Sequence, residues 1–133
     1  MTNGEGEYRL TEADLSQFTG TSQWFTGTSQ WYTHLLGLMY TDGVQYLAEQ
    51  GDAYWLLNAI ASWQSDPRVR DDRMLQQIQF WKLTVNENRS AVLICERDSD
   101  DVAVTQEIPF TDFPLREVRL YYQNGVLLLP SEY

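Results

Sequence analysis

Two residue types that often act as catalysts each occur once in this chain, at Cys95 and His34. A cysteine can attack an acyl carbon when a nearby histidine removes the thiol proton. Cys95, however, follows the apolar residues 92–94, and burial among apolar side chains raises the pKa of a thiol and lowers its reactivity. We therefore predict a structural cysteine and assign no catalytic residue.

His34 lies among aromatic residues, so it suits either a binding pocket or an active site. It is the single histidine of the chain, and Tyr40 or Asp42 could orient its ring for proton transfer. Three hypotheses stay open. His34 is a packing residue, it is the base of a small enzyme, or it joins Trp31, Tyr32 and Tyr40 in an aromatic pocket that binds or sequesters a small ligand.

The densest acidic segment is residues 98–101, which contain Asp98, Asp100 and Asp101. Its carboxylates resemble a calcium-binding loop only loosely, because an EF-hand also needs a glycine at its sixth position and a glutamate at its twelfth. One histidine and one cysteine are also too few for a site built from nitrogen and sulfur ligands. We therefore predict a solvated β-turn and expect neither a metal ion nor another cofactor.

The charge balance of the chain restricts the kind of partner it can bind. Nineteen acidic residues face nine basic ones, and the formal net charge is −10 at pH 7. Such a chain is repelled by nucleic-acid phosphates and by anionic membranes, so neither is expected as a direct partner. The charge favours a protein with a basic surface, and Asp98, Asp100 and Asp101 are the first candidates for that contact.

The length of 133 residues fits one domain, and 43% of the residues are apolar, which is enough for a sizeable core. Residues 1–7 lack the basic and apolar regions of a signal peptide, and no apolar run approaches the roughly 18 residues of a membrane span. A single cysteine excludes an intramolecular disulfide. We therefore predict a cytoplasmic protein, either a monomer or a homo-oligomer.

The first half of the chain has helical patterns. We expect residues 1–10 to be flexible, 11–64 to be mainly helical and 65–76 to form a charged connection or a short exposed helix. Within the helical part we predict a helix near 12–18, a helix around residues 44–48 that ends before Gly51, for which a hairpin turning at Asp42-Gly43 is the alternative, and a helix over 52–64 with Asp52 as N-cap. The last of these is apolar on nearly every side, which predicts a helix buried all round. The segment Phe18–Trp24 is repeated without change as residues 25–31, and we expect only one copy to pack.

The second half changes to short β runs at 78–85, 91–96, 102–108, 117–123 and 126–129. Asn124-Gly125 between the last two runs is typical of a type I′ hairpin turn. The predicted fold is therefore α+β, with N-terminal helices on one face of a five-stranded antiparallel sheet over residues 77–130. The predicted core contains Trp55, Leu56, Ile60, Phe80, Leu83, Leu93, Val104 and Leu120.

Several segments together resemble a family of small uncharacterised bacterial proteins from cyanobacteria and mobile elements. They are FTGTSQWY (25–32), YTDGVQYLAE (40–49), AYWLL (53–57), FTDFPL (110–115) and LLPSEY (128–133). The resemblance implies no known activity, so it assigns no functional residue. The implied setting and the acidity together favour a non-enzymatic protein-binding module, such as a phage or mobile-element inhibitor of a host defence or nucleic-acid-handling protein.

Overall fold

The structure is a computed structural model that describes residues 10–16, 32–33 and 37–133. The duplicated segment, Trp31 and His34 lie outside these described residues. The helices are α1 (Glu12–Ser16), α2 (Asp42–Gln50), α3 (Tyr54–Trp63), α4 (Pro67–Arg70) and the 3-10 turn η1 (Pro130–Glu132). The strands are β1 (Tyr32–Thr33), β2 (Met39–Tyr40), β3 (Gln79–Val85), β4 (Ala91–Asp98), β5 (Asp101–Ile108), β6 (Glu117–Gln123) and β7 (Val126–Leu128).

The α+β class is confirmed, and all five predicted strands form, as β3 to β7. The prediction of a five-stranded antiparallel sheet is wrong in its detail. Among the described residues the sheet has seven strands in the order β1-β2-β7-β6-β3-β4-β5, and β2 runs parallel to β7. The two additional strands are only two residues long, too short to show an alternating pattern. They exist because the chain around β2 donates backbone hydrogen bonds to the β7 hairpin, from Met39 N to Gly125 O and from Thr41 N to Leu127 O.

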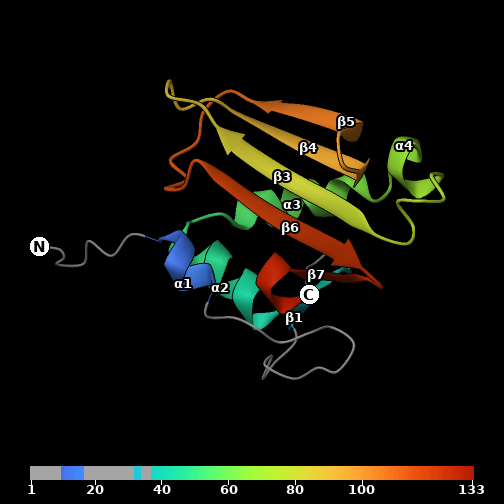
Figure 1. The fold of residues 1–133 in the computed structure, drawn as a ribbon, viewed down its shortest axis with the longest axis horizontal. Helices are drawn as coiled ribbons and strands as arrows, with labels where there is room; N and C mark the ends of the chain where they lie inside the picture. The colour runs from blue at the N-terminus through green and yellow to red at the C-terminus, as the bar shows by residue number, and fades with distance from the viewer. Residues whose placement is uncertain (1–9, 17–31, 34–36) are drawn as a thin grey trace, which may run out of the picture.

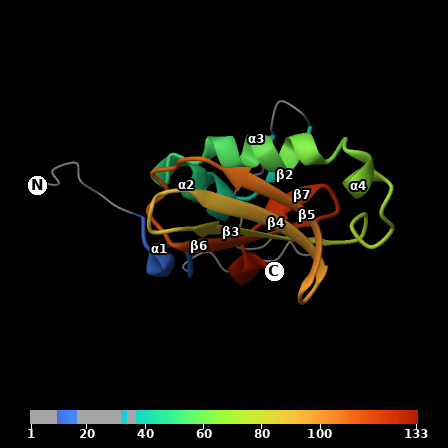
Figure 2. The same cartoon turned by 90° about the horizontal axis from the view of Figure 1, so that it is seen from above.

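Helices lie on both sides of this sheet, whereas the sequence predicted helices on one face. Figure 1 shows α3 behind β3 and β6, and Figure 2 shows α2 and α3 on one side with α1 and the C-terminal turn on the other. The Ser131 hydroxyl donates to the Leu15 carbonyl oxygen across 3.4 Å, which joins η1 to α1. The five-residue helix α1 therefore packs beside the end of the chain as well as against α2.

The core lies between the sheet and the pair α2–α3. Alternate residues of β3 point into it, since Trp81 and Leu83 are buried while Lys82 is half-buried. Six of the predicted core residues are confirmed as buried: Leu56, Ile60, Leu83, Leu93, Val104 and Leu120. Phe80 and Trp55 are only half-buried, because Phe80 points to the opposite face of the sheet from Trp81 and Trp55 lies on an outer flank of α3.

That outer flank also corrects the prediction that the helix is buried on every side. Asn58 and Ser62 are exposed, and Trp63 is half-buried. The helix begins one residue later than predicted, with Ala53 at the N-cap position and no side-chain cap. One side of α3 therefore packs on the sheet and the other remains open.

Glu132 joins the end of the chain to the start of α2, and we call this arrangement the C-terminal latch. Its side chain is 1% exposed. The carboxylate accepts hydrogen bonds from the Thr41 hydroxyl at 2.6 Å, the Gly43 N–H at 3.1 Å and the Leu129 N–H at 2.9 Å. The segments YTDGVQYLAE and LLPSEY thus meet at a structural contact that positions the first turn of a helix.

The described helices include none with the length and apolar character needed to cross a membrane.

Candidate functional site

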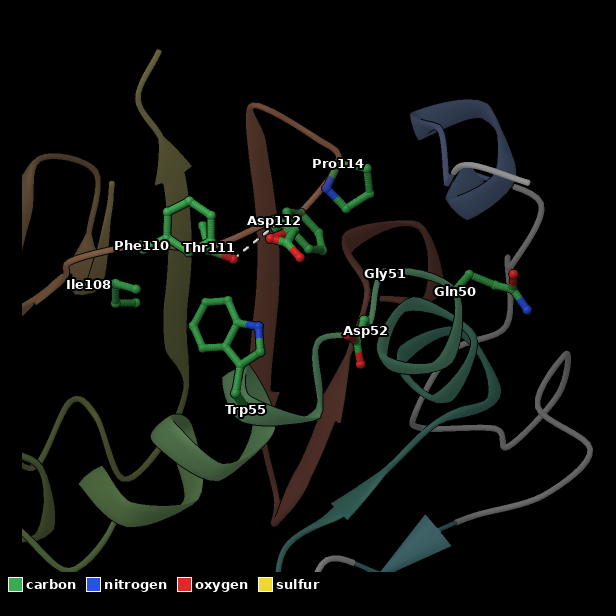
Figure 3. A pocket seen from close by; sticks show the side chains of 10 residues that line it. Gln50, Gly51, Asp52, Trp55, Ile108, Phe110, Thr111, Asp112 and Pro114 are labelled. Atoms are coloured by element: carbon green, nitrogen blue, oxygen red, sulfur yellow. Dashed lines mark hydrogen bonds between the residues drawn. The ribbon is translucent and has the colours of Figure 1, made fainter. Parts of the chain in front are cut away.

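An open groove runs between the outer flank of α3, strand β5 and the loop 109–114, and we call it the α3–β5 groove. It consists of two adjoining cavities of about 540 and 640 Å³ that share Trp55 and Ile108 in their walls. Each is within the size range of ligand sites in proteins. Figure 3 shows the Trp55 indole rising from α3 toward the loop that carries Phe110, Thr111 and Asp112.

The helical wall of the groove follows from the spacing of residues in α3. Trp55, Ala59 and Trp63 are separated by four residues each, so they form one stripe along the helix. The Trp63 indole N–H donates to Oε1 of Gln106 on β5 across 2.7 Å, which holds the helix against the strand. Two half-buried tryptophans thus line the groove. At the Trp63 end, this hydrogen bond fixes the distance between α3 and β5.

The loop wall is fixed by contacts behind it. The Thr111 N–H donates to the Arg89 carbonyl oxygen at 2.8 Å, and the Arg89 guanidinium donates to the Phe113 carbonyl oxygen at 3.0 Å. Phe113 is buried against Gly51, where an added Cβ would come within 2.8 Å of the Phe113 ring. These contacts leave Phe110 outside, with 66% of its surface exposed.

The groove is acidic. Asp52, Glu107 and Asp112 line it, all three are exposed, and none of them is in an ion pair with another described residue. Among the described residues its lining contains no lysine, arginine or histidine. Aromatic faces attract cations through the ring quadrupole, and carboxylates attract them by charge. This combination of side chains suits an ammonium or guanidinium group.

Next to one end of the groove, an arginine that is not part of its lining packs on one of the groove tryptophans. The Arg68 guanidinium lies over the Trp63 ring at 4.8 Å and pairs with Asp66 at 3.1 Å. Its hydrogen bonds and charge lower the pKa of the Asp66 carboxyl. In this molecule, therefore, a guanidinium already packs on a tryptophan that lies beside an aspartate.

The predicted aromatic pocket is described only in part, because Trp31 and His34 lie outside the described residues. Tyr32 and Tyr40 do meet, with stacked rings whose centroids are 5.3 Å apart. Nearby, the Tyr54 hydroxyl donates to Glu49 across 2.8 Å. Burial, followed by the hydrogen bond and charge of Glu49, raises the pKa of Tyr54 to about 12. These phenols therefore stay protonated at neutral pH and act as hydrogen-bond donors rather than bases.

The predicted acidic turn forms the exposed connection between β4 and β5, as a solvated turn should. Asp100 has a positive φ of 62°. Arg97 pairs with Asp101 at 2.9 Å and with Asp72 at 2.7 Å, so part of the turn's charge is balanced within the molecule. The turn lies at the start of β5, whereas the α3–β5 groove lies at the end of the same strand. Among the described residues, no three histidine, cysteine, aspartate or glutamate side chains are placed so that they could hold a metal ion together.

The Cys95 thiol should not react in the folded protein. It is completely buried, and burial raises its pKa to about 12, so almost no thiolate is present at neutral pH. We expect Ellman's reagent at pH 8 to label no thiol in the native protein and one per chain in denaturant. Rapid labelling of the native protein would contradict this burial.

Sequence reasoning missed the α3–β5 groove. Trp55 belongs to the predicted core, and residues 109–115 lie between the predicted β runs 102–108 and 117–123, so neither pattern predicts a groove. The apolar residues Phe110 and Phe113 within that loop were the one available signal, since a solvated loop rarely contains two phenylalanines.

The fold and groove define a small α+β protein with an open groove lined by acidic and aromatic side chains. Over residues 9–133 the chain matches the model of a family of unknown function (DUF6876), and it belongs to that family. Comparisons with curated proteins and with solved structures gave no match. The family match confirms the resemblance to an uncharacterised family.

Proposed function

We propose that this protein is a non-enzymatic binding module whose α3–β5 groove receives a cationic segment of a partner protein. The observation that carries the proposal is the groove lining, which combines exposed carboxylates with tryptophan and phenylalanine and has no basic residue among its described members. Tryptophan anchors and complementary charge are common features of protein interfaces.

The chemistry of the groove supports binding rather than catalysis. Its described lining offers no cysteine or histidine nucleophile, and Cys95 is buried with a raised pKa elsewhere in the sheet. A host defence or nucleic-acid-handling protein is a suitable partner, because such proteins present lysine and arginine on the surfaces that meet phosphates. An acidic inhibitor would compete for those same side chains.

Two matched triple variants test whether the groove is the binding surface. The groove variant is D52N/E107Q/D112N, and the turn variant is D98N/D100N/D101N. Each removes three carboxylates and takes the formal charge from −10 to −7. The probe is a fluorescein-labelled peptide of nine arginines, measured by anisotropy at about 20 mM and about 150 mM salt, since screening weakens contacts between exposed charges.

We expect the groove variant to bind this probe about tenfold more weakly, from the loss of three close charge contacts. The turn variant should change the affinity by less than about twofold, because Arg97 already balances part of its charge. Equal weakening by both variants would mean that the peptide responds only to net charge. Greater weakening by the turn variant would move the site to Asp98, Asp100 and Asp101.

A further inference from the structure

The following inference rests on the proposed function and specifies how the partner binds. We infer that the cationic segment binds in an extended conformation, as an additional strand on the outer edge of β5. Its side chains on one face then enter the α3–β5 groove. The occupant is a segment of a partner protein in which arginine or lysine alternates with apolar residues.

Strand β5 ends the sheet order, and its one pairing among the described strands is with β4. The backbone N–H and C=O groups on its other edge therefore point away from the sheet. Such an edge is a template for another strand unless bulges, prolines or covering elements block it. Peptides bind in this way when main-chain hydrogen bonds supply affinity and pockets select alternate side chains.

The first half of β5 has bulges and a covering helix, whereas among the described residues the stretch 104–108 has neither. The register with β4 shifts between Cys95 and Glu96 and again between Glu96 and Asp98, which are bulges opposite the start of β5. Helix α4 also contacts this strand, and both views show it near the end that carries the turn from β4 (Figures 1 and 2). From Val104 to Ile108 the pairing with β4 is regular. This regular half is the part that lines the groove.

The alternation of side chains along β5 directs an added strand toward the groove. Ile108 and Gln106 face α3, because they pair with the buried Ala91 and Leu93, whereas Glu107 alternates to the other side of the strand and lines the groove only from its edge. An added strand would lie about 4.8 Å from β5 and repeat this alternation. Every second side chain would then extend over the groove, and the others would lie on the side of Glu107.

The charges along this edge favour a basic occupant. Asp52 and Asp112 lie at the Trp55 end of the groove, and Glu107 lies on the strand itself. At the other end Arg68 already sits on Trp63 beside Asp66. The Trp55 end offers the same pair of side-chain types to a guanidinium from the partner. An acidic or neutral strand would leave these carboxylates without a counter-charge.

Three heptapeptides of alternating valine and arginine test the inference. The first is unmodified, the second is N-methylated at every valine and the third at every arginine. Backbone N–H groups of successive residues in a strand point to opposite edges, so each modification removes the hydrogen-bond donors of one edge only and leaves the carbonyl acceptors in place. The side chains and the net charge are the same in all three peptides. Affinity is measured by calorimetry, and amide hydrogen exchange is followed over β5 with and without the unmodified peptide.

We expect one methylated peptide to bind more than about tenfold more weakly than the unmodified peptide, through the loss of about three main-chain hydrogen bonds, and the other to bind nearly as well. Amides in residues 104–108 should exchange more slowly in the complex. If both methylated peptides bind like the parent, or both weaken equally, edge pairing on β5 is wrong. The proposed function would still hold if the unmodified peptide loses affinity for D52N/E107Q/D112N, and it would fail if that variant binds the peptide as well as the wild type does.

Discussion

Replacing Glu132 with alanine should lower the free energy of unfolding by about 3–5 kcal/mol, out of the roughly 5–15 kcal/mol typical of a domain. The change leaves the Thr41 hydroxyl and the N–H groups of Gly43 and Leu129 without their acceptor. These groups are buried and water cannot readily replace the carboxylate, so each contributes a desolvation penalty. Urea denaturation followed by circular dichroism measures the loss.

Two further variants serve as controls for Glu132. Glu132→Gln keeps the shape and one carbonyl oxygen, so we expect it to lose less stability than Glu132→Ala. Glu87→Ala removes a carboxylate that is 91% exposed, and it should change the stability by no more than about 0.5 kcal/mol. A loss below about 1 kcal/mol for Glu132→Ala would show that the C-terminal latch is not part of the cooperative unit.

Trp81→Ala is the second change with a large expected effect, a loss of about 3–5 kcal/mol. Trp81 lies in the strand β3 and is 2% exposed. Its indole N–H donates to Oε1 of Gln79 at 2.8 Å, and the Gln79 amide also exchanges hydrogen bonds with Gln64 at the end of α3. Alanine would leave a cavity and remove one link between sheet and helix. Chemical denaturation measures the change in the free energy of unfolding.

Trp55→Ala is the matched control, because it removes the same side chain from the outer flank of α3. We expect its cost to stay below that of Trp81→Ala, since a half-buried indole loses less contact area on truncation. In addition, Trp55→Ala should weaken binding of the arginine peptide, whereas Trp81 does not line the α3–β5 groove. If the two variants lose the same free energy of unfolding, Trp55 is a core residue and not part of an open groove wall.

The strands of the second half could be predicted because their patterns are local. Alternating apolar residues define β3 to β6, and Asn124-Gly125 makes the turn between β6 and β7, with φ angles of 55° and 79°. The strands β1 and β2 could not be predicted, since two residues show no period. Strand β2 depends on pairing between Met39 and Val126, which are far apart in the sequence, and β1 in turn pairs with β2.

The candidate site was harder to predict than the fold, because helical periodicity reports which residues share a face and not what covers that face. Trp55 follows the apolar pattern of α3 yet lies beside a groove. The net charge predicts a basic partner, but it does not say which carboxylates already have an ion-pair partner within the fold. Asp101 has an arginine partner while Asp112 has none among the described residues, and only the fold decides this difference.

The C-terminal latch has a consequence for the order of folding. Thr41 and Glu132 are 91 positions apart, so the entropy of closing the intervening loop must be overcome before their hydrogen bond forms. The hairpins β3–β4 and β4–β5 join neighbours in the sequence and can form first. Contacts made after the transition state govern how fast a protein unfolds rather than how fast it folds. We therefore expect the latch to close after the hairpins, and contacts that form this late lengthen the lifetime of the native state.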